Sequence, residues 1–291
     1  MLKENLERLF EFIALHIPSE QIMQAKKIYQ KTTGEIYEDD KSYNSRMALF
    51  LEWYLLDNYT PGTQNTILES LTEENKTTWS QSHLEVCQDI ANNIQALFEV
   101  KKVRDTSVTV LDLLIDEKYE IEEPDSKLIF RKNDIFQGRI VPHRGKWHFT
   151  GYFCFHPSKT QKYIKNEAKE FFILQRTWIK ELTGLEKELS KFGKAFLKNS
   201  KYIEKIKTRI EHIDYETKID ELTRELLILE KNKRDLEIST QEIDNKIAHL
   251  KNVTIKLEGR RLISELINKL AYMNLKWERS RQIEISDIYK N

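Results

Sequence analysis

The 291-residue chain is 40% hydrophobic and 32% charged, and its formal net charge is zero. Its 5 Trp, 12 Tyr and 13 Phe residues need a buried core, which excludes a disordered chain. No apolar run approaches the ~20 residues that span a bilayer, and glutamates interrupt the apolar N-terminal stretch MLKENLERLFEFIALHIP, unlike a signal peptide. We therefore expect a cytoplasmic protein that does not enter the membrane.

The zero net charge hides three segments of different sign. Residues 1–126 carry 12 Lys and Arg against 24 Asp and Glu, a charge of −12, and residues 127–166 carry 9 against 1, a charge of +8. Residues 167–291 carry 26 against 22, which adds the remaining +4. The acidic and basic segments either face each other within the molecule or face partners of opposite charge.

Residues 1–95 are predicted to form an acidic region of four or five short helices. Leu6, Leu9 and Ile13 place apolar side chains on one face of a helix. A second stripe of apolar residues at helical spacing occurs over residues 47–55. Such amphipathic helices bury their apolar faces against one another, which predicts a small bundle.

From residue 96 the apolar period changes to two, which is typical of strands. Short runs such as TSVTVLDL and DIFQGRIV alternate with turn residues up to residue 157. A flat meander of such strands would leave exposed edges, and closure removes them. We therefore expect a small basic, antiparallel β-barrel over residues 96–157, of the oligonucleotide-binding or the Src-homology type.

The segment RGKWHFTGYFCFHP at residues 144–157 is predicted to be a single strand of this barrel. Its odd positions include Trp147, Phe149, Phe153 and Phe155, which we expect to point into the core. The even positions then form the outer face of the barrel.

That outer face is the candidate for nucleic-acid binding. Barrels that hold single strands combine a cationic groove with aromatic stacking platforms. On this hypothesis Tyr152 and His148 stack on bases, and Lys146 and Arg144 contact phosphates. The candidate residues are Arg131, Lys132, Arg139, Arg144, Lys146, His148 and Tyr152. The alternatives are a face that is merely solvated, or one that the acidic region neutralises.

Residues 158–291 are predicted to form long helices with a coiled coil. Neither Pro nor Gly occurs over residues 194–258, and Ile and Leu recur there at alternating spacings of three and four. The stripe changes register at residues 212–216, where the chain either continues or turns; residues 239–242 are a second candidate turn. Pairing within one chain and pairing in a homodimer are therefore both open. The predicted interface residues are Ile203, Ile206, Ile210, Leu222, Leu226, Leu229, Leu236, Ile243, Ile247 and Leu250.

Motifs for catalysis are not found. The sequence contains no Gly-x-Gly, no Gly-x-Ser-x-Gly and no His-Glu-x-x-His pattern. His148, Cys154 and His156 share one face of an extended strand, but about 20 Å separates His148 from Cys154 at the rise of a strand, too far for one zinc ion. We therefore expect no catalytic residue, no cofactor and no metal site.

Two stretches show a resemblance to other proteins. RMALFLEWYLLD at residues 46–57 and KLAYMNLKWERSRQIEISDIY at residues 269–289 resemble segments of uncharacterised bacterial proteins. Those proteins join a helical N-terminal region, a strand-rich middle and a long helical tail. The resemblance implies a bacterial origin and carries no activity.

These observations predict an α+β protein with a helical N-terminal bundle, a small antiparallel β-barrel and C-terminal coiled-coil helices. The predicted function is that of a non-enzymatic interaction or scaffold protein. It assembles with a protein partner or with itself through the coiled coil, and the barrel is a second contact surface. The alternative is a nucleic-acid-binding protein that uses the basic aromatic face of the barrel.

Overall fold

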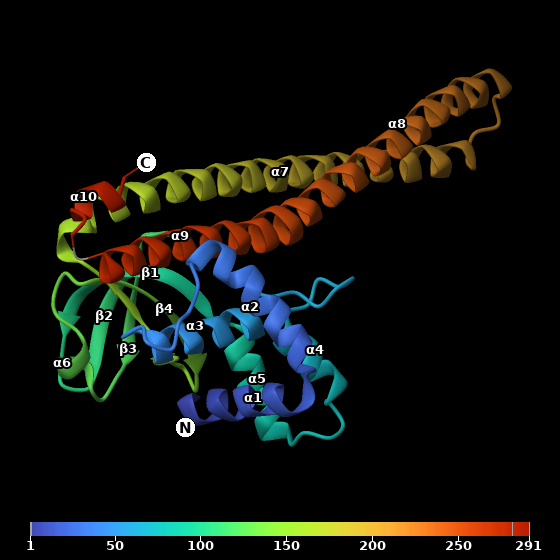
Figure 1. Ribbon diagram of the computed structural model, residues 1–291. Helices are drawn as coiled ribbons and strands as arrows, with labels where there is room; N and C mark the ends of the chain where they lie inside the picture. Colours follow the sequence, from blue (N-terminus) through green and yellow to red (C-terminus); the bar gives the residue numbers. More distant parts are fainter. Residues whose placement is uncertain (1, 281, 291) are drawn as a thin grey trace. The chain divides into compact units, whose positions relative to one another are not determined.

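The computed structural model describes residues 2–280 and 282–290, and it has a mixed α+β fold (Figure 1). It contains a helical N-terminal region, a closed five-stranded barrel and long C-terminal helices, so the predicted fold class is confirmed. The chain divides into two compact units. The first unit comprises the described residues of 1–173 and 260–291, and the second comprises Leu174–Gly259.

The N-terminal region is a set of five helices whose ends follow from local sequence. Pro18 precedes the second helix, and Thr66 and Glu69 form a capping box at the start of the fourth. Arg46 closes the end of the second helix, because its Nη2 donates hydrogen bonds to the carbonyl oxygens of Thr33 and Gly34, both at 2.9 Å. The helices are α1 (Leu2–His16), α2 (Ser19–Thr33), α3 (Tyr43–Leu56), α4 (Ile67–Glu74) and α5 (Gln81–Ala91).

The strand-rich middle forms a ring of five strands in the order β1-β2-β3-β5-β4, which β4 closes by pairing with β1. All pairs in the ring are antiparallel except β3–β5, which is parallel. A sixth strand pairs with β4, and the short helix α6 (Ser126–Ile129) joins β3 to β4. The strands are β1 (Ile94–Val103), β2 (Ser107–Asp112), β3 (Glu117–Glu122), β4 (Ile135–His143), β5 (Lys146–Phe149) and β6 (Cys154–His156).

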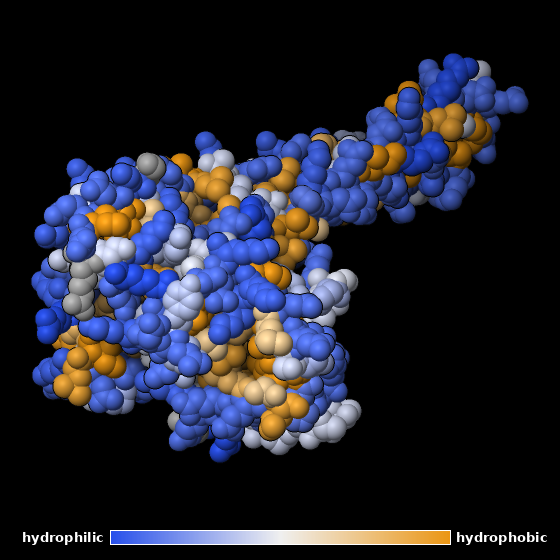
Figure 2. All heavy atoms as spheres, in the orientation of Figure 1, coloured by the Kyte–Doolittle hydropathy of each residue, from blue (hydrophilic) through white to orange (hydrophobic). Residues whose placement is uncertain are grey.

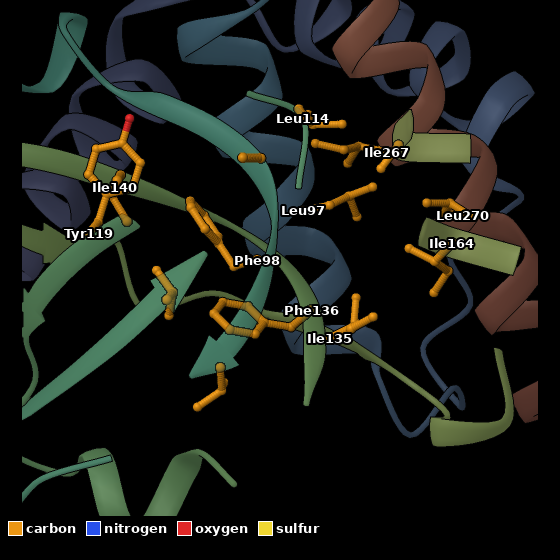
Figure 3. Close-up of a cluster of buried hydrophobic side chains, with 14 of the residues drawn as sticks. Leu97, Phe98, Leu114, Tyr119, Ile135, Phe136, Ile140, Ile164, Ile267 and Leu270 are labelled. Atoms are coloured by element: carbon orange, nitrogen blue, oxygen red, sulfur yellow. The ribbon is translucent and has the colours of Figure 1, made fainter. Parts of the chain in front are cut away.

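A cluster of aromatic and branched side chains fills the barrel and continues between the barrel and the helices that pack on it (Figure 3). Phe98 of β1 and Phe136 of β4 are fully buried, and their ring centroids lie 5.7 Å apart. Ile164, from the start of α7 (Gln161–Ile210), packs in the same cluster. Ile267, from α9 (Gly259–Arg279), joins it as well. The long helices therefore contribute directly to the core of the first unit.

The predicted inward face of residues 144–157 is confirmed. Phe149 is buried in the barrel core, and Trp147, Phe153 and Phe155 are half-buried against the same cluster. The single strand predicted there is, however, interrupted. β5 and β6 pair with the same edge of β4 but are separated by four residues, where Gly151 adopts a φ of +105°.

The even positions, predicted to form the outer face of the barrel, are not all exposed to solvent. Thr150 and His156 are buried, and Tyr152 is half-buried. Tyr152 packs against the helical N-terminal core, and His156 lies beside Tyr289, which follows the short helix α10 (Ile285–Ile288). The outside of the barrel is thus covered by elements distant in the sequence.

The second unit is a helical hairpin made by the distal part of α7 and by α8 (Glu216–His249), which run side by side in opposite directions (Figure 1). The chain turns at residues 211–215, the first of the two predicted turns. A π-helical segment, Leu250–Glu258, follows α8, and a 3-10 turn, Ser158–Thr160, precedes α7. Among the described residues, no helix combines the length and the apolar character needed to cross a bilayer.

Candidate interaction surfaces

A basic cavity of about 690 Å³ opens at one end of the barrel. The end of β1 and the segment after α6 supply its lining. A β-bulge between Val100 and Lys102 places an extra residue, Lys101, in β1, so that both lysines line the cavity. The lining residues are Lys101, Lys102, Val103, Lys127, Phe130, Arg131 and Lys132.

The segment that carries Arg131 and Lys132 is held against β1 by backbone hydrogen bonds. The N–H of Asn133 donates to the carbonyl oxygen of Val100 at 2.8 Å, and the N–H of Val100 donates to that of Asp134 at 2.9 Å. The carboxylate of Asp134 also accepts from the N–H of Arg131 at 2.8 Å. The two cations are therefore presented by a fixed turn.

Part of the charge at this cavity is neutralised internally. Lys101 Nζ lies 3.0 Å and Lys165 Nζ 2.9 Å from the Glu99 carboxylate. Burial opposes ionisation of Glu99, but the hydrogen bonds from Lys165 and Lys101 outweigh it and lower its pKa. Lys127 pairs with Asp105. Lys102, Arg131 and Lys132 form no ion pair with any residue that the structure describes.

Two further predicted cations lie on the barrel but do not line this cavity. Arg144 is exposed in the turn between β4 and β5, where its φ is +51°. Lys146 is 62% exposed in its side chain and pairs with Glu122, and His148 Nε2 lies 3.9 Å from the same carboxylate. Burial lowers the pKa of His148, although Glu122 acts against this. The structure therefore does not gather the predicted nucleic-acid-binding residues into one site.

Arg139 does not belong to any outer face. It is 2% exposed, and its guanidinium contacts the Asp57 carboxylate and donates from Nη1 to the Asn93 side chain at 2.6 Å. Its Nε lies 3.7 Å from the carboxylate of Glu52, and burial raises the pKa of that carboxyl to about 7. The N-terminal helices cover β4 at this point, so Arg139 serves the packing of helices on barrel and is unavailable to phosphates.

Tyr152 is half-buried against the N-terminal helices. Its ring packs on the N-terminal core, with its centroid 6.5 Å from that of Phe10. Base stacking requires an exposed aromatic face, so this packing disfavours the predicted role of Tyr152.

In the part of the chain that the structure describes, no three His, Cys, Asp or Glu side chains lie close enough together to hold a metal ion. His156, weighed above as a ligand, is buried, and burial lowers its pKa to about 4. Its Nδ1 lies 3.3 Å from the hydroxyl oxygen of Tyr289.

The predicted coiled-coil residues lie along the contact between α7 and α8. Ile203 and Ile206 of α7 and Ile243, Ile247 and Leu250 near the end of α8 are buried. The other predicted residues, Ile210, Leu222, Leu226, Leu229 and Leu236, are half-buried. The pattern of burial follows the spacing of three and four along both helices.

Asn199 is a residue of this seam that the apolar pattern missed. It is 8% exposed, and its Nδ2 donates to the carbonyl oxygen of Leu229 at 2.9 Å. Lys207 pairs with Glu230 at 3.2 Å across the same hairpin. A buried amide in a helical seam favours one register over others. In the sequence, such a residue can be found where a polar side chain interrupts the run of Ile and Leu at a seam position.

Comparison with known proteins places the chain in a family. Residues 2–202, more than half of the chain, match the family of unknown function DUF7986. The chain belongs to this family. The matched region contains the N-terminal helices, the whole barrel and most of α7. No curated protein and no solved structure matches the sequence.

Proposed function

We propose that this member of DUF7986 is a non-enzymatic interaction protein, with the hairpin Leu174–Gly259 as its main contact module and the barrel as a second contact surface. The observation that carries the proposal is that this hairpin forms a compact unit whose buried residues follow a single seam. We further propose that the seam packs as an antiparallel coiled coil.

The burial of the seam within one chain determines which surface of the hairpin is available to a partner. Ile206 and Ile243 are 3% and 6% exposed within one chain, so their apolar surface is already removed from water. A homodimer through this seam would first have to open the hairpin. The proposed contact surface is therefore the outer face of the hairpin, and the seam supplies its rigidity.

The first test opens the hairpin in the full chain. Ile206→Asp with Ile243→Asp buries two charges and disrupts the seam. Thr208→Asp with Asn245→Asp, at two exposed positions nearby, adds the same charge and serves as the control. We expect a monomeric mass by light scattering for the wild type, and loss of co-purifying partners only for the seam variant. A dimeric wild type that the seam variant converts to monomer would replace this proposal with assembly through the seam.

The second candidate function is phosphate contact at the basic end of the barrel. Lys102, Arg131 and Lys132, without ion pairs among the described residues, favour it. Phe130 in the cavity lining is buried, so it offers no face for stacking. Oligonucleotide-binding barrels bind nucleic acid on the face of their second and third strands. In this barrel Glu120 is exposed on β3, and its negative charge disfavours phosphates on that face. The barrel is thus suited to hold phosphate groups at its end.

This candidate is tested with a labelled single-stranded 12-mer and fluorescence anisotropy. Arg131→Glu with Lys132→Glu is expected to weaken binding and to lower the slope of log K against log salt by about 1.4, which is about 0.7 for each lost phosphate contact. Lys118→Glu with Lys159→Glu, two exposed lysines outside the cavity, is the control. Equal losses in both variants would remove the barrel from this role.

A further inference from the structure

A row of lysines follows one face of α7 within the hairpin. The lysines recur at spacings of four, three, four, three and four residues, which keeps them on one side of a helix. All of them are exposed. We call this row the lysine ridge; it consists of Lys187, Lys191, Lys194, Lys198, Lys201 and Lys205.

The ridge lies on the face of α7 that points away from α8. The buried positions Asn199, Ile203 and Ile206 define the seam as positions a and d of a heptad, and the ridge occupies positions c and f on the outer side of the helix. Lys205 follows Lys187 by 18 residue steps, which span about 27 Å at ~1.5 Å per residue. Because α8 packs against α7 along the seam, the helix that carries the ridge is held in place, while the lysine side chains extend from it into solvent.

The charge of the ridge is not neutralised by the hairpin. None of the six lysines forms an ion pair with a residue that the structure describes, whereas Lys207 nearby pairs with Glu230 and Lys251 pairs with Glu186. Between Lys187 and Lys205 the two ridge positions of the heptad carry lysine without exception. Like charges three and four residues apart disfavour a helix, so the folded hairpin keeps a repulsion that an anionic partner would relieve.

We propose that the lysine ridge binds the phosphate backbone of a double-stranded nucleic acid. This inference rests on the proposed role of the hairpin as the contact module and names its partner. A duplex carries about one negative charge per 1.7 Å of its axis, so a row of about 27 Å faces many phosphates at once. Such contacts fix position on the duplex without reading sequence.

Single strands and membranes fit the ridge less well. Single-strand sites need exposed aromatic platforms, and Phe192 and Phe196 are half-buried. A helix that lies in a membrane surface needs a continuous apolar face beside its cations. The exposed apolar neighbours of the ridge, Leu197 and Tyr202, lie on its opposite flanks and do not form such a face. Figure 2 shows scattered hydrophobic residues on an otherwise largely hydrophilic hairpin.

The test measures binding of the full chain to a labelled 20-base-pair DNA duplex across a salt series. With five to six phosphate contacts we expect a slope of log K against log salt of about −5. Lys191→Glu with Lys194→Glu and Lys198→Glu reverses the centre of the ridge, and we expect its affinity to fall at least tenfold and its slope to shrink by about 2.7. These changes also remove like-charge neighbours along α7, so the helix is retained, which circular dichroism checks.

The matched control is Lys218→Glu with Lys231→Glu and Lys246→Glu, three exposed lysines of α8. It changes the net charge of the hairpin equally and is expected to keep most of the affinity and the slope. Equal losses in both variants, or no binding of the duplex by the wild type, would overturn the inference. So would stronger binding to the single-stranded 20-mer or to phosphatidylserine vesicles at equal charge. Nuclease-resistant capture of a protein through the intact hairpin, with no duplex binding, would leave the proposed function standing and remove this inference alone.

Discussion

The two compact units differ in whether their cations are paired with carboxylates. In the first unit, cations of the basic segment 127–166 meet carboxylates of the acidic segment 1–126. Arg139 contacts Glu52 and Asp57, and Lys165 contacts Glu99. In the hairpin, the lysine ridge lies exposed along α7 without such partners among the described residues.

The difference shows that the net charge of a segment does not predict how much charge that segment exposes on the surface. The segment of +8 is the strongest cationic signal in the sequence, yet much of it is matched within the first unit. Residues 167–291 carry only +4, yet they contain the lysine ridge, whose six cations form no ion pair with a residue that the structure describes. Spacing along a helix and burial, rather than net charge, decide what a partner meets.

The largest expected effect comes from breaking the interior charge cluster. Arg139→Ala leaves Glu52 and Asp57 without their buried counter-charge, and the loss of one partner of a buried pair costs about 3–5 kcal/mol. Urea denaturation should show this loss in the free energy of unfolding. Arg104→Ala, which breaks the exposed pair with Glu120, should cost less than about 1 kcal/mol. Similar losses would mean that Arg139 is not a buried partner.

The pH dependence of stability tests a second buried charge of the first unit, the carboxyl of Asp112. Burial raises the pKa of Asp112, which accepts from the N–H of Leu114 at 2.8 Å, from 3.8 to about 7. Because this folded pKa lies above the unfolded one, its stabilising contribution is complete below about pH 4 and is lost as pH rises through about 7. Asp112→Asn should therefore gain roughly 3–4 kcal/mol over the wild type between pH 4 and pH 8. A difference that does not change with pH would contradict an ionisable buried carboxyl here.

The independence of the hairpin is tested at its seam. Ile206→Ala removes a side chain that is 3% exposed, and such truncations cost about 2–4 kcal/mol. Hydrogen exchange should become faster in the distal part of α7 and in α8, while the barrel strands keep their protection. Leu227→Ala, at a side chain that is 59% exposed, should change exchange little. Loss of protection throughout β1–β5 would show that the two units unfold together.

The smallest expected effect has the opposite sign. Asn199→Leu replaces a buried amide whose Oδ1 finds no partner in the described structure, and it should stabilise the hairpin by about 1 kcal/mol. It also removes the hydrogen bond to Leu229 that favours one register. Spin labels at Lys198 and Lys231 should then report a broader distribution of distances. A destabilised variant with an unchanged distribution would remove Asn199 from the role of register residue.

The sequence by itself determined the kinds of element and the sides that they bury. Apolar period is a short-range property, so the change from helical spacing to alternation near residue 96 located the barrel. The same reasoning pointed Phe149 inward and aligned Ile203 and Ile206 along one stripe. It also included Arg131 and Lys132, which line the basic cavity.

The tertiary structure decided which of the outward-facing side chains remain exposed to solvent. Arg139 lies inside because α3, which carries Glu52, and Asp57, the residue after this helix, cover β4. This contact joins residues more than eighty positions apart in the sequence, and no local period encodes it. The bulge at Lys101 likewise depends on pairing with β2. The hairpin closes because one turn brings two stripes together, which leaves the lysine ridge, and not the seam, in solvent. The burial of a residue depends on every element that packs on it, whereas the apolar period that includes it depends only on its neighbours in the sequence.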